Sequence, residues 1–497
     1  MPFNSYSYLL FLPAVCLLYC LVGARNRWLA LLLASLVFYA APGEPVLFLA
    51  LGLVAGTAYL TGLELSRLPL GRRRSLAFWA GVAFLLLVLL GMKYVPFLSH
   101  NLNVLLHWTG TELRLAEPGA VASLGVSFFV IQAISYLADM HRGLAPAEKH
   151  SGRFALYLCF FPKLTQGPIE RAGDLLPQLK SLRLPDPGDV REGLLLLTWG
   201  VFKKVVIADR LALFVDPIYG RVHLYAGLPL LFATYLFALQ LYADFSGYTD
   251  MALGAARLFG VRLTQNFDSP YLARSVADFW RRWHISFSSW LRDYVFLPLV
   301  YKTGRALDGR LPRVISEEKL GYAVAALATM ALAGLWHGAA LHYVAWGLVI
   351  AAFMVLSVLT RKPRRRLAKL LYGGRLRGVH DAVKIVTTFN LICLAWIFFR
   401  APSLRDAWYT LTHLFTGGVA SLGALQDLRL SAHALTASNG DLVIACASLG
   451  IMALAPGLAP RFSRGPWWIR WSAYGALVGW IVLFATERGG AFLYARF

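Results

Sequence analysis

The sequence predicts an all-α membrane protein, a polytopic bundle of about ten to twelve helices that span or partly enter a bilayer. The chain is 58% hydrophobic and only 15% charged, and its mean hydropathy is +0.58. Apolar blocks recur from near the first residue almost to the last, and a spanning helix needs roughly 20 such residues. The blocks are continuous instead of alternating with a period of two, which favours helices over a membrane barrel.

The basic residues indicate contact with lipid and not with nucleic acid. The formal net charge is +22, but the arginines and lysines gather in short junctions between apolar blocks, at residues 25–27, 72–74, 361–377 and 461–470. Such junctions are typical of cytoplasmic loops and also attract anionic head groups. No soluble basic face is available for nucleic acid. We therefore expect a multi-pass membrane protein whose basic junctions face the cytoplasm.

The chain forms a single membrane domain, residues 1–497, in three parts. Residues 1–118 hold apolar segments with few charges, typical of scaffold helices. In residues 119–345, ionisable side chains interrupt the apolar runs, and such groups at membrane depth usually face a cavity or one another. We assign the catalytic core to this part and C-terminal helices to residues 346–497. Residues 267–300 and 403–437 are too polar for simple spans, and the second stretch is expected to be re-entrant or interfacial.

His337 is the first candidate for chemistry. It lies in the sequence AGLWHGA (333–339), after Trp336 and between Gly334 and Gly338, inside an apolar block. Burial disfavours a charged imidazole, so such a histidine is a free base that can take a proton from a hydroxyl. The two glycines leave room for a ligand or for a neighbouring helix. A histidine that only bonds across helices is the alternative.

The second candidate is the segment 279–294, which reads as one amphipathic helix. Its aromatic residues fall on one stripe, which would anchor the helix at the membrane interface. His284 and the arginines can face a cavity, where guanidinium groups suit the phosphates of a coenzyme A donor or an anionic sugar polymer. The candidate residues of this segment are Arg281, Arg282, Trp283, His284 and Ser288.

The third candidate is QLYADFSGYTD (240–250), with Gln240, Tyr242 and Asp244 as predicted cavity-lining residues. Its alternating oxygens resemble a calcium loop only superficially, because Thr249 and Ala255 stand where Gly and Glu are required. We predict no metal site, and a hydrogen-bonded polar network is favoured over capping of a helix end. The sequence also lacks a Gly-x-Ser-x-Gly elbow and a phosphate-binding GxxxxGK[ST] loop. The remaining mechanism is direct transfer of a group to an acceptor that a histidine activates.

Several of these segments together resemble the membrane-bound O-acyltransferase (MBOAT) family, in particular its bacterial branch of alginate O-acetylation membrane proteins. The matching segments occur in the family's order and extend over most of the chain. They are LGVSFF (124–129), FPKLTQGPIE (161–170), QLYADFSGYTD (240–250), NFDSPY (266–271), WRRWHISFSSWLRDY (280–294), GLWHG (334–338) and AWIFFR (395–400).

The resemblance implies a ring of helices around a central tunnel and an enzyme that moves an acetyl group from cytosolic acetyl-CoA to a hydroxyl of an extracytoplasmic polysaccharide. The family's catalytic histidine corresponds to His337, and its second polar position corresponds to His284. Acetyl-CoA is then a donor substrate, and no bound cofactor is implied. The resemblance also implies a periplasmic partner of the SGNH-hydrolase type, since this chain has no Gly-Asp-Ser motif.

Three alternatives stay open at this point. A carrier-protein thioester could supply D-alanine or another acyl group, as in the related teichoic-acid D-alanylation proteins, which tend to lack a C-terminal extension like residues 400–497. A transporter could use the polar middle of the chain as a path, although no inverted repeat is evident. A scaffold without chemistry could recruit a periplasmic acetyltransferase.

Overall fold

The computed structural model describes residues 1–111, 113–117, 124–307, 316–372, 376–416, 438–486 and 492–493. The described chain is helical, and its one β-type pairing is an isolated antiparallel bridge between Phe267 and Trp283. The predicted all-α fold is confirmed. The chain forms two compact units, of which unit 1 comprises residues 1–197 and 249–265, and unit 2 comprises residues 198–248 and 266–497. The prediction of a single domain in three parts stays a prediction.

The described residues include seven helices that are long and apolar enough to cross a membrane. They cover Pro45–Arg67, Arg72–Trp108, Leu228–Arg257, Glu317–His337, Leu341–Leu359, Arg377–Arg400 and Gly440–Leu458. Two shorter apolar helices, Tyr6–Leu21 and Val126–His141, are added to these. The chain is therefore a multi-pass membrane protein, and the higher helix count, which included partly inserted helices, stays a prediction.

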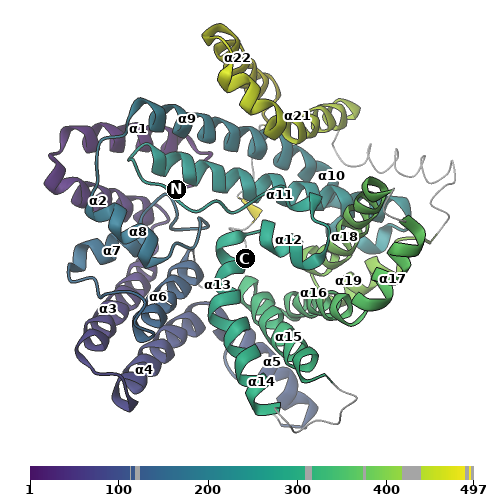
Figure 1. Ribbon diagram of the computed structural model, residues 1–497, viewed down its shortest axis with the longest axis horizontal. Helices are drawn as coiled ribbons and strands as arrows, with labels where there is room; N and C mark the ends of the chain where they lie inside the picture. The colour runs from purple at the N-terminus through teal and green to yellow at the C-terminus, as the bar shows by residue number, and fades with distance from the viewer. Residues whose placement is uncertain are drawn as a thin grey trace. The chain divides into compact units, whose positions relative to one another are not determined.

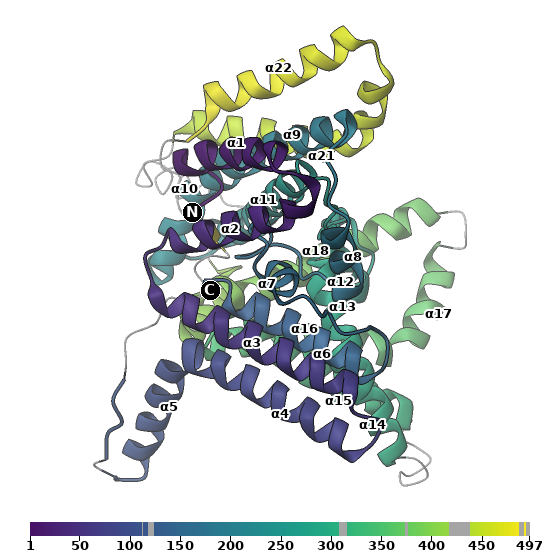
Figure 2. The same cartoon turned by 90° about the vertical axis from the view of Figure 1, so that its left-hand side faces the viewer.

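Unit 1 contains most of the N-terminal helices. They are α1 (Tyr6–Leu21), α2 (Arg27–Ala40), α3 (Pro45–Arg67), α4 (Arg72–Leu89), α5 (Val95–Trp108), α6 (Val126–His141), α7 (Ser151–Cys159) and α8 (Ala172–Lys180). Within this unit α3, α4 and α6 lie side by side (Figures 1 and 2). Gly62 of α3 allows this close packing, because a side chain at this position would collide with the ring of Tyr136 on α6.

Buried polar side chains of unit 1 are paired with one another. The Nζ atom of Lys163 donates to Oε1 of Gln132 at 2.6 Å and to the carbonyl of Leu158 at 3.1 Å. Glu170 accepts hydrogen bonds from the amide and the hydroxyl of Thr264 at 2.6 and 3.0 Å. Because buried polar groups need such partners, these contacts explain how the polar residues of this part of the chain are accommodated.

Unit 2 holds all the predicted site residues. Its helices are α10 (Asp209–Gly220), α12 (Val276–Arg282), α13 (Ile285–Leu291), α14 (Leu297–Leu307), α15 (Glu317–His337), α16 (Leu341–Leu359), α17 (Arg361–Tyr372), α18 (Arg377–Arg400), α19 (Leu404–His413), α21 (Asn439–Arg464) and α22 (Trp467–Phe484). Two longer helices, α9 (Pro187–Val201) and α11 (Leu228–Arg257), contribute residues to both units. Two segments, Phe202–Ala208 and Arg292–Phe296, have the wider π-helical turn.

The antiparallel pair α15 and α16 packs closely because of three glycines. The hydroxyl of Ser316 caps α15 by accepting from the amide of Lys319, and Glu317 and Glu318 follow in the first turn, where the helix dipole favours acidic groups. A side chain at Gly334 or at Gly338 would collide with Tyr343 of α16, and one at Gly347 would collide with the carbonyl of Met330. The glycines beside His337 therefore admit the neighbouring helix.

The prediction of one continuous helix over residues 279–294 is wrong. Helix α12 ends at Arg282, Trp283 is extended, and α13 begins at Ile285. The segment preceding α12 causes this break, because the amide of Asp268 donates to the carbonyl of Arg282 at 3.0 Å and the amide of Ile285 donates to the carbonyl of Asn266 at 2.9 Å. Backbone bonds to a distant segment thus replace helical bonds. The prediction that residues 267–300 are no simple span is confirmed.

Three of the five residues in the predicted anchoring stripe face protein instead of the membrane interface, whereas Trp280 and Tyr294 are partly exposed and their anchoring role stays a prediction. Trp283, Phe287 and Trp290 are buried by protein, with at most 7% of each side chain exposed. The other non-spanning stretch, residues 403–437, is described only to residue 416 and contains α19. Residues 417–437 lie outside the described residues, and the expected re-entrant or interfacial position of this stretch stays a prediction.

Candidate functional site

His337 is the last residue of α15 and is almost completely buried, at 3% exposure. Four aromatic rings surround its imidazole with centroid separations of 4.9–5.6 Å, and each meets it nearly edge-on. They belong to Phe287 of α13, Trp336 of α15, Trp346 of α16 and Phe399 of α18. The sequence-based expectation of a histidine in an apolar wall therefore agrees with its position.

His284 occupies the turn between α12 and α13. It has left-handed backbone geometry, with φ of +44°, and 1% of the residue is exposed. Its Nδ1 atom lies 3.4 Å from Oδ1 of Asn266, and its ring meets Phe245 edge-on at 4.7 Å. This turn lies outside the candidate spans. Burial lowers the pKa of His284 to about 3, so its imidazole is neutral at physiological pH.

The two histidines share two aromatic neighbours. Phe287 and Trp336 stack on each other with centroids 4.2 Å apart, and we call them the shared aromatic pair. His284 lies 5.2 and 6.3 Å from these two rings, and His337 lies 5.6 and 4.9 Å from them. Residues from two separate parts of the sequence, the turn at His284 with the following α13 and the end of α15, thus form one cluster. Two imidazoles beside a single apolar wall can bind a hydroxyl, and one of them can take its proton.

Asp244 is buried in a cluster of charges. One oxygen accepts from Nζ of Lys204 at 2.9 Å, and the other accepts from the amide of Leu493 at 2.8 Å. The same ammonium group lies 2.7 Å from a carboxylate oxygen of Asp209 and 4.6 Å from the ring centre of Phe492. Asp244 lies within α11 and not at its end, so it belongs to a polar network and does not cap the helix, while the predicted position of this network along a cavity stays a prediction. A role of Asp244 in donor binding stays a prediction.

Two of the remaining candidates, Tyr242 of α11 and Ser288 of α13, contact Trp283 beside the turn at His284. The ring of Tyr242 lies 6.2 Å from that of Trp283, and Ser288 donates its hydroxyl proton to the carbonyl of Trp283 at 2.9 Å. Gln240 is 2% exposed, and its Oε1 atom has no hydrogen-bond partner among the described residues. An unpaired buried acceptor is costly in a folded protein, which is consistent with a ligand that donates a hydrogen bond.

The two arginines end α12 and are more open to solvent. The side chain of Arg281 is 73% exposed and that of Arg282 is 32% exposed. Both lie 3.3 Å from Oδ1 of Asp278, and Arg282 also lies 3.8 Å from Asp268. Asp278 therefore orients both guanidinium groups while leaving much of Arg281 available to an anion.

Sequence reasoning missed several residues of the site. Trp346 and Phe399 border His337, Asn266 supports His284, and Lys204 pairs with Asp244. Asn266 belongs to the motif NFDSPY, which was noted without a role for its side chain. Among the residues that the structure describes, no group of three or more His, Cys, Asp or Glu side chains could hold a metal ion.

Asn266 is a positioning residue for His284, and its replacement by alanine is expected to reduce turnover about tenfold. Its Oδ1 atom accepts from the amide and the hydroxyl of Ser286 at 3.1 and 2.7 Å, beside the imidazole. Loss of this acceptor leaves buried donors unpaired, which costs about 1–3 kcal/mol. The rate per folded molecule and the unfolding temperature are measured together.

Asn390→Ala is the control for Asn266→Ala. Asn390 accepts a 2.6 Å bond from Tyr235 away from the two histidines, so its removal should reduce stability and leave the rate per folded molecule unchanged. Equal losses of turnover in both variants would show that Asn266 has only a structural role.

Comparison with known proteins gives consistent matches. Residues 150–370, which contain every predicted site residue, match the model of MBOAT, the membrane-bound O-acyltransferase family. The chain is 34% identical over 434 residues to the "Probable alginate O-acetylase AlgI" of Pseudomonas aeruginosa, which covers 87% of this chain and 78% of that protein. It is 31% identical over 407 residues to the peptidoglycan O-acetyltransferase of Helicobacter pylori, with 76% and 71% covered. The teichoic acid D-alanyltransferase of Streptococcus thermophilus is 28% identical over 298 residues, with 58% and 70% covered.

Proposed function

Because this chain belongs to the membrane-bound O-acyltransferase family, it is an O-acyltransferase, and we propose that it transfers an acetyl group from cytosolic acetyl-CoA to a hydroxyl of an extracytoplasmic polysaccharide. The observation that carries this proposal is the pair of buried histidines beside the shared aromatic pair. Two of its relatives are named as O-acetylating enzymes, one for alginate and one for peptidoglycan. Enzymatic function replaces the alternatives of a transporter and of a scaffold without chemistry.

In the proposed mechanism His337 is the general base. Its neutral imidazole takes the proton from the acceptor hydroxyl as the oxygen attacks the thioester carbonyl. The new C–O ester bond forms, the C–S bond breaks, and the imidazolium returns the proton to the departing coenzyme A thiolate. The burial of His337 among four aromatic rings supports this role, because it excludes water that would hydrolyse the thioester.

His284 acts second in this proposal, by orienting the acceptor: its single N–H donates from Nδ1 to Oδ1 of Asn266, so its Nε2 atom can accept a hydrogen bond from a neighbouring hydroxyl of the acceptor. Its low pKa of about 3 supports a neutral hydrogen-bonding role and opposes a role as a charged acid. Contact with Asn266 and its left-handed backbone hold the ring in one orientation.

The donor would approach from the cytoplasmic side, with its phosphates near Arg281 and Arg282. The exposure of Arg281 and the fixed guanidinium of Arg282 beside Asp278 support a binding site for anions. Trp283, Trp336, Ser288, Tyr242, Gln240 and Asp244 are proposed to line the passage to His337. We further propose the bacterial inner membrane as the location and a periplasmic SGNH-type acetyltransferase as the partner that completes polymer modification.

Acetyl transfer is preferred over D-alanyl transfer because of the extent of the matches. The alginate-related match covers 87% of this chain, whereas the match to the D-alanyltransferase covers 58%. In this proposal the acetyl and the D-alanyl group would both arrive as a thioester. The identity of the donor therefore distinguishes the two functions. The chemistry at His337 would be the same for either donor.

Inside-out vesicles that contain the protein provide the test. Acetyl-CoA labelled in the acetyl group is supplied outside the vesicles, and release of free coenzyme A and transfer of label to polysaccharide enclosed within the vesicles are measured. We expect both to depend on the protein, and a D-alanyl carrier-protein thioester to be consumed far more slowly. Faster consumption of the carrier thioester would replace acetyl with D-alanine, and consumption of neither thioester would contradict the proposed donors.

A further inference from the structure

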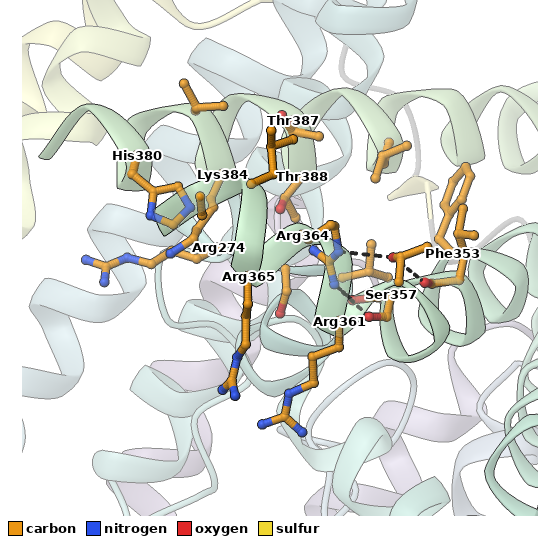
Figure 3. A pocket seen from close by; sticks show the side chains of 18 of the residues that line it. Arg274, Phe353, Ser357, Arg361, Arg364, Arg365, His380, Lys384, Thr387 and Thr388 are labelled. Carbon is orange, nitrogen blue, oxygen red and sulfur yellow. Dashed lines mark hydrogen bonds between the residues drawn. The ribbon is translucent and has the colours of Figure 1, made fainter. Parts of the chain in front are cut away.

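A pocket of about 690 Å³ lies among α16, α17 and α18, with the start of α12 at its edge (Figure 3). Helix α17 connects two candidate spans, Leu341–Leu359 and Arg377–Arg400. It is amphipathic, with arginines and lysines on one face and leucines on the other. A basic amphipathic helix between two spans is typical of a segment that lies in the membrane interface. The pocket therefore lies at the level of lipid head groups.

The polar lining of this pocket is strongly basic. Arg274, Arg361, Arg364, Arg365 and Lys384 line it, and its described lining contains no Asp or Glu. Asp381 lies 3.1 Å from Arg274 and 3.2 Å from Lys384 and compensates these two charges.

The three arginines of α17 that line the pocket have different surroundings. Arg364 turns towards Ser357 and donates to its carbonyl at 2.6 Å and to its hydroxyl at 2.9 Å (Figure 3). Arg361 and Arg365, which we call the pocket arginines, stand one helical turn apart and extend in the same direction. The described residues provide no ion pair for either of them. Two guanidinium groups at this spacing suit a phosphate.

The other side of the pocket is apolar. Phe353 and Leu356 of α16, Leu367 and Leu371 of α17, and Leu391 of α18 line it. A free phosphate ion in solution has no apolar part that could cover this wall. The part of a lipid acyl chain next to the head group would cover the wall and shield it from water. The combination of a phosphate-binding end and an apolar wall indicates an amphipathic anion.

We propose that this pocket binds an anionic phospholipid of the cytoplasmic leaflet, with its phosphate on Arg361 and Arg365 and the start of an acyl chain on the leucines. The volume lies within the range of ordinary ligand pockets, about 300–1,000 Å³. The basic junction at residues 361–377 is of the kind found on the cytoplasmic side, where anionic lipids are available. This proposal does not depend on the identity of the acyl donor or the acceptor.

The test uses the full-length protein in detergent, to which phosphatidylglycerol or phosphatidylcholine is added, with bound lipid counted by native mass spectrometry. We expect phosphatidylglycerol to bind preferentially and the double variant Arg361→Gln/Arg365→Gln to bind it about 25-fold more weakly, from roughly fivefold per basic residue. The matched control is Lys362→Gln/Arg366→Gln. It removes the same charge at the same spacing on the same helix, but neither residue lines the pocket, so this variant should bind like the unchanged protein.

Three results would overturn the proposal. Equal weakening in both double variants would reduce it to general attraction by a basic helix. Unchanged binding in the pocket variant would place the lipid elsewhere. Displacement of phosphatidylglycerol by adenosine 3′,5′-bisphosphate, with loss of that compound's own binding in the pocket variant, would assign the pocket to a soluble phosphate and not to a lipid. Thermal unfolding of both variants verifies that they are folded.

Discussion

Replacing His337 with alanine is expected to lower the rate of acetyl transfer by about 10²–10⁴-fold, the usual contribution of a general base. The change removes the imidazole from its position among Phe287, Trp336, Trp346 and Phe399. Membrane insertion should persist, because the four neighbouring aromatic rings provide most of the apolar contacts at this position. The measurement is transfer of labelled acetyl from acetyl-CoA in vesicles with equal amounts of inserted protein.

His342→Asn is the matched control for His337→Ala. His342 is a second buried histidine of the α15–α16 pair, at 8% exposure, and its Nδ1 atom lies 3.0 Å from the carbonyl of Phe398. The amide nitrogen of asparagine can occupy the place of Nδ1 and keep this hydrogen bond. We expect the control to retain its rate within a few-fold. A His337→Ala protein that transfers acetyl at the unchanged rate would refute the assignment of the base.

Replacing Lys204 with methionine is expected to lower the free energy of unfolding by about 3–5 kcal/mol, since it leaves two carboxylates buried without their cation. At most 7% of the side chains of Lys204, Asp209 and Asp244 is exposed. The ammonium group lies within 2.9 Å of both carboxylates, so it neutralises them together. Thermal unfolding in detergent, with the amount of protein recovered from membranes, is the measurement.

The double variant Lys204→Met/Asp244→Asn tests the cause of this destabilisation. Removing one of the two negative charges relieves the unpaired carboxylates, so the double variant should be more stable than Lys204→Met alone. A simple loss of side-chain packing would instead make the two substitutions additive. Unfolding of Lys204→Met at the temperature of the unchanged protein would show that the cluster contributes little to stability.

The fold class and the position of His337 could be predicted from the sequence because both depend on local patterns. Continuous apolar blocks indicate membrane helices. A histidine inside such a block becomes buried when the helix packs against its neighbours. The polar character of residues 119–345 also pointed to buried pairs such as Lys163 with Gln132 and Lys204 with Asp244. Their partners could not be named, because they lie 31 and 40 positions apart in the chain.

The break at Trp283 and His284 could not be predicted from the periodicity of its own segment. That segment has the pattern of a helix, and the bonds that interrupt it come from Asn266 and Asp268. The role of Gly334 and Gly338 had two open interpretations, a ligand or a helix, and only the position of Tyr343 decided between them. Tertiary contacts of this kind override local propensity.

The left-handed backbone at His284 affects how substitutions at this position must be interpreted. An L-residue in this region costs roughly 1–2 kcal/mol, and asparagine and glycine adopt it most readily. A β-branched replacement such as valine would push the chain out of this conformation and disturb the bridge between Phe267 and Trp283. An inactive valine variant would therefore report a displaced main chain, whereas asparagine or glycine would isolate what the ring nitrogens themselves contribute.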